Sequence, residues 1–140
     1  MQGYKVSYLV DGDDFTVAGE ASRNLKKILT QLGIDSKLIR KATIAMYEGE
    51  INMVIHADGG VIDVTVTQDK IHMFLKDKGP GISNINLAMT EGYSTASEEV
   101  RQLGFGAGMG LPNMKKYTDY FNIDTVVGEG TTVEMIVNIT

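Results

Sequence analysis

Three polar residues near the middle of the chain have a spacing that can support phosphate chemistry. Glu48, Asn52 and His56 follow one another at intervals of four, so in a helix they project from one face, beside the apolar stripe. A carboxylate one turn before an amide can combine a general base with an oxygen ligand for Mg²⁺. The same spacing is also common on solvated helix faces, and we assign no chemistry to His56.

A second candidate site follows a predicted strand, where the chain reads Asp77-Lys78-Gly79-Pro80-Gly81. An acidic acceptor at a strand end can take a hydrogen bond from an exocyclic amine, while the glycines let the backbone pass close to a flat ring. The alternative is a plain turn, because aspartate, glycine and proline are the residues that turns favour.

Alternate glycines form the third and fourth candidates. Gly104, Gly106, Gly108 and Gly110 lead into a predicted helix start at Pro112 and Asn113. Backbone amides in such a loop can surround phosphate oxygens with help from the helix N-terminus. The run lacks the Gly-Lys-Ser/Thr ending of a P-loop and contains no G-x-G-x-x-G motif, and a flexible hinge is the alternative. The later cluster, Gly128-Glu129-Gly130-Thr131-Thr132, is fully explained as a hairpin turn when taken alone.

Hydrophobic periodicity predicts the elements that must position these residues. Strands are expected at 4–10, 61–67, 71–76, 123–127 and 131–139. Helices are expected at 18–32, from Asp35 or Ser36 to Ala57, at 84–89, and from Pro112 through Phe121, with a loop at 90–107. This order indicates an α+β fold, a two-layer sandwich with a mixed, mostly antiparallel sheet covered on one face by helices. We expect residues 1–140 to form a single domain, since no linker or repeat is visible.

Composition excludes several classes of function. Thirteen Lys and Arg against eighteen Asp and Glu give a formal charge of -5, which argues against a nucleic-acid partner. The chain has no cysteine and only two histidines, so disulfides, thiolate nucleophiles and histidine-rich metal clusters are excluded. We expect a soluble, cytoplasmic protein without a membrane partner, because there is neither a signal peptide nor an apolar run near 18 residues.

The order of the four motifs along the chain narrows the choice of protein family more than any single motif does. Glu-x-x-x-Asn, Asp-x-Gly-x-Gly, alternate glycines before a helix and Gly-x-Gly-Thr before the last strand together resemble the GHKL superfamily of ATP-binding domains, over essentially the whole chain. The chain is especially similar to the small anti-sigma factor and serine-protein kinases of bacterial partner switching, closest to the switch-kinase branch. That similarity is carried by Glu91-Gly92-Tyr93-Ser94-Thr95, by Gly104 to Asn113, and by Tyr120-Phe121.

The resemblance implies a role for each motif residue. Glu48 would activate the attacking hydroxyl or water, Asn52 would bind Mg²⁺, and Asp77 would read the adenine amino group. It also implies that Gly79 and Gly81 line the pocket for the adenine base, and that Thr131 or Thr132 supports the adenine through a hydroxyl. Residues 90–110 would form the ATP lid. Within that lid the phosphates would be bound by Gly104, Gly106, Gly108 and Gly110. Arg101 is a further candidate for the terminal phosphates, by its charge and its position in the lid.

Two neighbours of Glu48 depart from the family pattern. Gly49 costs about 1 kcal/mol of helix propensity, and Glu50 adds a second acid, so the efficiency of catalysis stays open.

The function expected from the resemblance is an ATP- and Mg²⁺-dependent protein serine/threonine kinase. It would phosphorylate a STAS-type antagonist protein, bind a sigma factor or phosphatase, and form a homodimer. One alternative is a nucleotide-gated anti-sigma or protein-binding regulator without significant phosphotransfer. Another is the ATPase part of a sensor histidine kinase, which is disfavoured because 140 residues leave no room for a dimerising phosphoacceptor helix pair.

Overall fold

The sheet is the base on which the other elements of the fold are arranged. The structure, a computed structural model, describes residues 3–12, 18–56, 59–79, 89 and 110–140. Its strands run in the spatial order β1-β2-β3-β5-β4, and each described pair of neighbours is antiparallel. The strand bounds are β1 Tyr4–Asp11, β2 Gly59–Val66, β3 Lys70–Asp77, β4 Tyr120–Val126 and β5 Gly130–Asn138.

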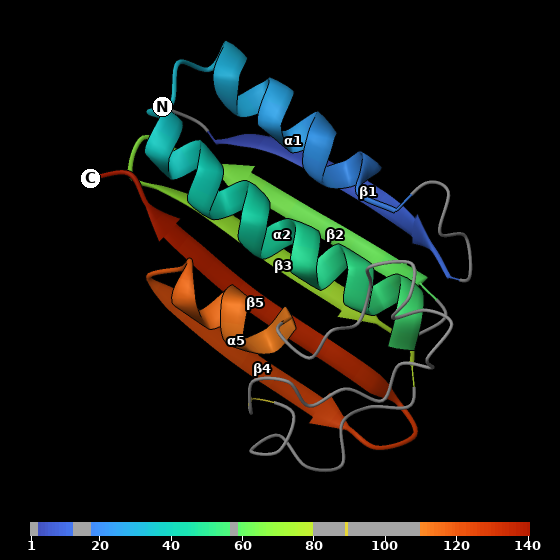
Figure 1. Cartoon of the computed structure of the whole chain (residues 1–140). Helices are drawn as coiled ribbons and strands as arrows, with labels where there is room; N and C mark the ends of the chain where they lie inside the picture. The colour runs from blue at the N-terminus through green and yellow to red at the C-terminus, as the bar shows by residue number, and fades with distance from the viewer. Residues whose placement is uncertain (1–2, 13–17, 57–58, 80–88, 90–109) are drawn as a thin grey trace.

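Three helices cover one face of this sheet (Figure 1). They are α1 Glu20–Gln31, α2 Ser36–His56 and α5 Gly110–Lys116. Alternate residues of the central strands, such as Ile62, Met73 and Met135, are fully buried beneath them, as expected for strands with one apolar face. The predicted α+β fold with helices on one face is therefore confirmed. None of the helices in the described part of the chain is long and apolar enough to cross a membrane.

Local signals set the ends of the first two helices. The chain leaves α1 at Gly33, which has a φ of +76°, and the amide of Ile34 donates to the Leu29 carbonyl at 3.1 Å. Asp35 then accepts a hydrogen bond from the Lys37 amide at 2.8 Å, which is the interaction of an N-cap residue. The predicted start of the second helix is confirmed.

The prediction that the last helix continues through Phe121 is wrong. Helix α5 ends at Lys116, and the Thr118 hydroxyl donates to the Met114 carbonyl at 2.7 Å. The Asp119 amide instead donates to the Ile136 carbonyl of β5 at 2.8 Å. Phe121 consequently lies in β4, opposite Met135. Pairing with β5 therefore overrides the helical spacing of the sequence. The helix predicted at 84–89 and the loop predicted at 90–107 lie outside the described residues, apart from Met89.

Candidate nucleotide site

Glu48 and Asn52 lie on the side of α2 that meets α5. Both side chains are half-buried. A Cβ atom added to Gly110 would lie 2.8 Å from Asn52 Nδ2, so the start of α5 passes directly over this amide. One turn further along α5, Asn113 Nδ2 donates a hydrogen bond of 3.5 Å to Glu48 Oε1. The two helices thus bring the end of the glycine run to the predicted base and metal ligand.

The environment of Glu48 alters its acid–base behaviour. Burial raises the pKa of its carboxyl above the ordinary value of 4.5, and the hydrogen bond from Asn113 opposes that rise. Desolvation disfavours the charged form of a carboxylate, so ionised Glu48 binds a proton more readily than a solvated glutamate does. Such a group is suited to act as a general base.

Asn113 is the site residue that sequence reasoning left without a role. A usable signal was present, because Gly110 and Asn113 are three apart and share a helix face. The pair matches Asn52 and Glu48, which are four apart on the facing helix.

The structure explains both departures from the family pattern. A Cβ atom at Gly49 would lie only 2.2 Å from Leu75 Cδ2, so glycine lets α2 approach β3 closely. Glu50 is 3% exposed and points away from the site. Its carboxylate accepts hydrogen bonds of 3.0 and 3.1 Å from the amides of Gly19 and Ala21, and bonds of 3.1 and 2.7 Å from the amide and hydroxyl of Ser22. Glu50 therefore anchors the start of α1 and is not available as a second base.

Asp77 connects the ends of two strands. Its Oδ1 atom accepts hydrogen bonds from the Gly79 amide at 2.9 Å and from the Thr131 amide at 3.1 Å. A Cβ atom at Gly130 would lie 2.2 Å from the Asp77 carbonyl oxygen, so only glycine fits there. These contacts place the second motif directly beside the fourth. The described residues supply no hydrogen bond to Oδ2 of Asp77. This second oxygen is therefore able to accept a hydrogen bond from a ligand.

The two candidate threonines lie on opposite faces of the sheet. Thr131 is buried on the helix-covered face, and its hydroxyl lies 2.9 Å from that of Thr125. Thr132 pairs with Lys76 and Asp124 on the uncovered face, because successive residues of a strand point to opposite sides. The structure thus brings Thr131 to Asp77 and keeps the Thr132 side chain away from it.

All of these groups gather towards one end of the molecule. The end of α2, the end of β3, the start of β5 and the start of α5 lie there together (Figure 1). Met53, the neighbour of Asn52, contacts Gly60, and Gly60 pairs with Asp77. The remaining predicted site residues lie outside the described part of the chain; these are Gly81, Arg101, Gly104, Gly106 and Gly108.

The donor set fits a magnesium ion shared with a phosphate ligand. Within the described segments there is no group of three or more His, Cys, Asp and Glu residues placed to hold a metal. An amide oxygen at Asn52, one turn from Glu48, supplies a single hard ligand. Mg²⁺ is commonly bound in this way, through one or two protein oxygens together with substrate phosphates and waters.

Comparisons with known proteins agree with this geometry. A family model described as the histidine kinase-like ATPase domain matches residues 14–137. The serine/threonine-protein kinase RsbT of Bacillus subtilis is 31% identical over 127 residues, covering 88% of this chain and 87% of that protein. An anti-sigma F factor of Anoxybacillus flavithermus is 32% identical over 105 residues, covering 75% of this chain and 65% of that protein.

A solved structure shares the fold. The RsbU and RsbW domains of a Mycobacterium tuberculosis protein align with a TM-score of 0.62 and 17% identity, covering 96% of this chain and 32% of that one. The chain belongs to the histidine kinase-like (GHKL) ATPase domain family, among its partner-switching kinases and anti-sigma factors.

Proposed function

We propose that the protein is an ATP- and Mg²⁺-dependent serine/threonine kinase that phosphorylates a STAS-type antagonist protein. The observation that carries the proposal is Glu48, a half-buried carboxylate with a raised pKa, one turn before Asn52 and hydrogen-bonded to Asn113. The similarity over most of the chain to a protein named as a serine/threonine kinase supports it.

Each described site residue has a distinct task in this reaction. Glu48 accepts the proton of the attacking hydroxyl, and Asn113 orients its carboxylate. Asp77 accepts a hydrogen bond from the adenine amino group, beside Gly79 and Thr131. Asn52 supplies an oxygen to Mg²⁺, which neutralises phosphate charge when it is bound. Positioning and charge neutralisation provide most of the catalysis in phosphoryl transfer.

The proposal extends to residues beyond the described segments. Gly81 lines the base pocket with Gly79, and residues 90–110 act as a lid whose glycines and Arg101 contact the phosphates. The whole chain, residues 1–140, works as one domain in the cytoplasm, where it exchanges partners such as a sigma factor or phosphatase and forms a homodimer.

A second candidate function is a nucleotide-gated regulator that holds a protein partner without phosphotransfer. The observation that favours it is the similarity to several proteins named anti-sigma F factors.

The two functions separate in one labelling experiment. The protein is incubated with γ-labelled ATP and candidate STAS-type proteins, and nucleotide affinity is measured by calorimetry. The kinase predicts label on a serine or threonine of one partner.

Glu48→Gln is expected to keep ATP affinity and lose about 10²- to 10⁴-fold in rate, and Asn52→Ala to lose Mg²⁺-dependent affinity. Glu134→Gln, on the uncovered sheet face, is the matched control. Tight ATP binding with no transfer supports the regulator.

A further inference from the structure

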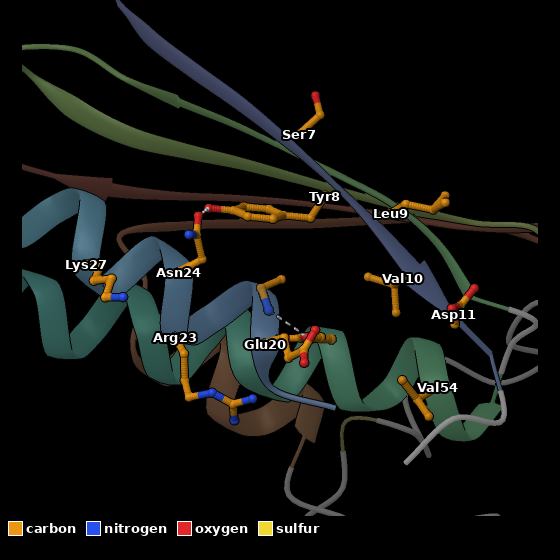
Figure 2. A pocket seen from close by; sticks show the side chains of 12 residues that line it. Ser7, Tyr8, Leu9, Val10, Asp11, Glu20, Arg23, Asn24, Lys27 and Val54 are labelled. Carbon is orange, nitrogen blue, oxygen red and sulfur yellow. Dashed lines mark hydrogen bonds between the residues drawn. The ribbon is translucent and has the colours of Figure 1, made fainter. Parts of the chain in front are cut away.

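A large groove lies between β1 and α1 (Figure 2). It is on the side of α2 opposite α5 (Figure 1). Its volume is about 830 Å³. Residues from Ser7 to Asp11 line it on the strand side, and Arg23, Asn24 and Lys27 line it on the helix side. The groove exists because α1 packs mainly against α2 rather than on β1. The Tyr8 hydroxyl, which donates to Asn24 Oδ1 at 2.7 Å, links α1 to the strand.

The strand wall of the groove is the edge of a sheet. Within the described residues β1 pairs with β2 alone, so its other edge presents backbone N–H and C=O groups at a regular spacing. The strand has eight residues, about 26 Å at the usual rise. It contains no proline, its register with β2 is unbroken from Tyr4 to Asp11, and its charged residues are Lys5 near the start and Asp11 at the end. Proteins usually protect such an edge by shortening, bulging or charging it, because it can pair with another strand.

The helix wall gives the groove a polarity. Lys27 is the basic residue of α1 at one end, and the acidic side chains of the lining are Asp11, Glu20 and the buried Glu50. Figure 2 places Lys27 and Asp11 at opposite ends of the groove. A ligand strand oriented with its acidic side chain next to Lys27 is attracted by the lysine. In the reverse orientation the same side chain lies next to Asp11 and is repelled.

We propose that this groove binds an extended segment of a partner protein, which adds as a strand to the free edge of β1. The segment carries acidic side chains where it faces Lys27, and neutral or basic ones at the Asp11 end. A peptide backbone matches the hydrogen-bonding repeat of β1, which other polyanions do not. The proposal goes beyond the kinase function and does not depend on it, since the groove shares no residue with the nucleotide site.

The test uses the full chain and synthetic octapeptides. The acidic probe alternates valine with threonine and has glutamate in place of two threonines near one end; a second peptide has lysine there, and a third is the acidic peptide with every backbone nitrogen methylated. Binding is followed by calorimetry and by amide hydrogen exchange. The acidic peptide is expected to protect amides within Tyr4–Asp11, and the other two to bind at least tenfold more weakly.

Charge variants on one helix give the matched control. The variant Lys27→Glu is expected to weaken the acidic peptide at least fivefold. Lys26→Glu makes the same kind of charge change on α1 but does not line the groove, and it should alter the affinity less than twofold. Protection elsewhere than β1, equal binding of the methylated peptide, or equal effects of the lysine variants would overturn the proposal. So would a dimer in sedimentation whose β1 amides are already protected, because a second copy would then occupy the edge.

Discussion

The two oxygens of Asp77 have different surroundings, and this difference decides how the residue can be tested. Oδ1 accepts from the amides of Gly79 and Thr131 and so organises the protein. In the proposed function, Oδ2 is the atom that accepts from the adenine amino group. A substitution that preserves the first oxygen and replaces only the second will separate ligand recognition from folding.

Asp77→Asn makes that change, because its amide oxygen can keep both backbone hydrogen bonds while an NH₂ group replaces Oδ2. A donor then faces the donor on adenine. ATP affinity in calorimetry is expected to fall at least tenfold, about 1.4 kcal/mol, with an unchanged unfolding transition. A folded variant with wild-type affinity would show that adenine is read elsewhere.

The burial of Glu48 makes the free energy of unfolding depend on pH, and it determines the sign of that dependence. Folding raises the pKa of this carboxyl, so the folded state binds the proton more tightly than the unfolded chain does. Ionisation therefore lowers the free energy of unfolding as the pH rises from the usual carboxyl range to above the raised pKa. Glu48→Gln removes this penalty, and the variant should be more stable than the wild type at neutral pH.

Urea denaturation at neutral pH and below about pH 4 measures this effect. The stability advantage of Glu48→Gln is expected at neutral pH and should disappear in acid, where Glu48 is protonated in both states. The exposed Glu20 provides a control as Glu20→Gln. An advantage of the same size at both pH values would mean that ionisation of Glu48 is not its cause.

At the scale of elements, the packing of α2 on β3 depends on Gly49. Gly49→Ala gains about 1 kcal/mol of helix propensity, but its Cβ would meet Leu75 at 2.2 Å. Overpacking in a core typically costs about 1 to 3 kcal/mol, so we expect a net loss of stability. Thermal unfolding measures it, and Leu75→Val in the same chain should recover part of the loss. If the two changes simply add, the two side chains do not interact and the steric explanation fails.

The elements that the sequence predicted best are those with capping or turn residues at their ends and with alternating buried and exposed side chains. Asp35 and Gly33 mark their helix ends through their own chemistry, and the strand pattern around Met73 follows from one buried face. Phe121 was misassigned because its pairing with Met135 depends on a strand that follows it. The partners of Glu50 lie about thirty residues away on α1, and no local pattern encodes them.

Site prediction had the same limit. Glu48 and Asn52 share a face because helical spacing requires it, whereas the contact of Asn113 with Glu48 depends on how α5 packs on α2. The choice between Thr131 and Thr132 needed the register of β5 with β3. Sequence therefore identifies the motifs, and tertiary packing selects which of their atoms meet.

At the scale of the whole molecule, the described helices carry more basic than acidic side chains. Residues of the three described helices include eight of the thirteen Lys and Arg and only three of the eighteen Asp and Glu. Of these three acids, Glu50 is buried and Glu48 is half-buried in the site, so Glu20 is the exposed one. Within the described residues of this protein, whose net charge is -5, the helix layer is thus basic, and such a surface is expected to attract an acidic partner.

This excess of basic side chains predicts the kinetics of association with the proposed STAS-type substrate. Stopped-flow association rates should fall steeply as ionic strength rises from about 0.05 to 0.5 M, because screening shortens the range of the attraction. The double variant Lys37→Glu, Arg40→Glu on α2 should slow association roughly three- to tenfold. Lys70→Glu, Lys76→Glu reverses two charges on β3 instead and should change the rate less than twofold. Equal slowing by both pairs would show that net charge, rather than a basic helix face, guides the encounter.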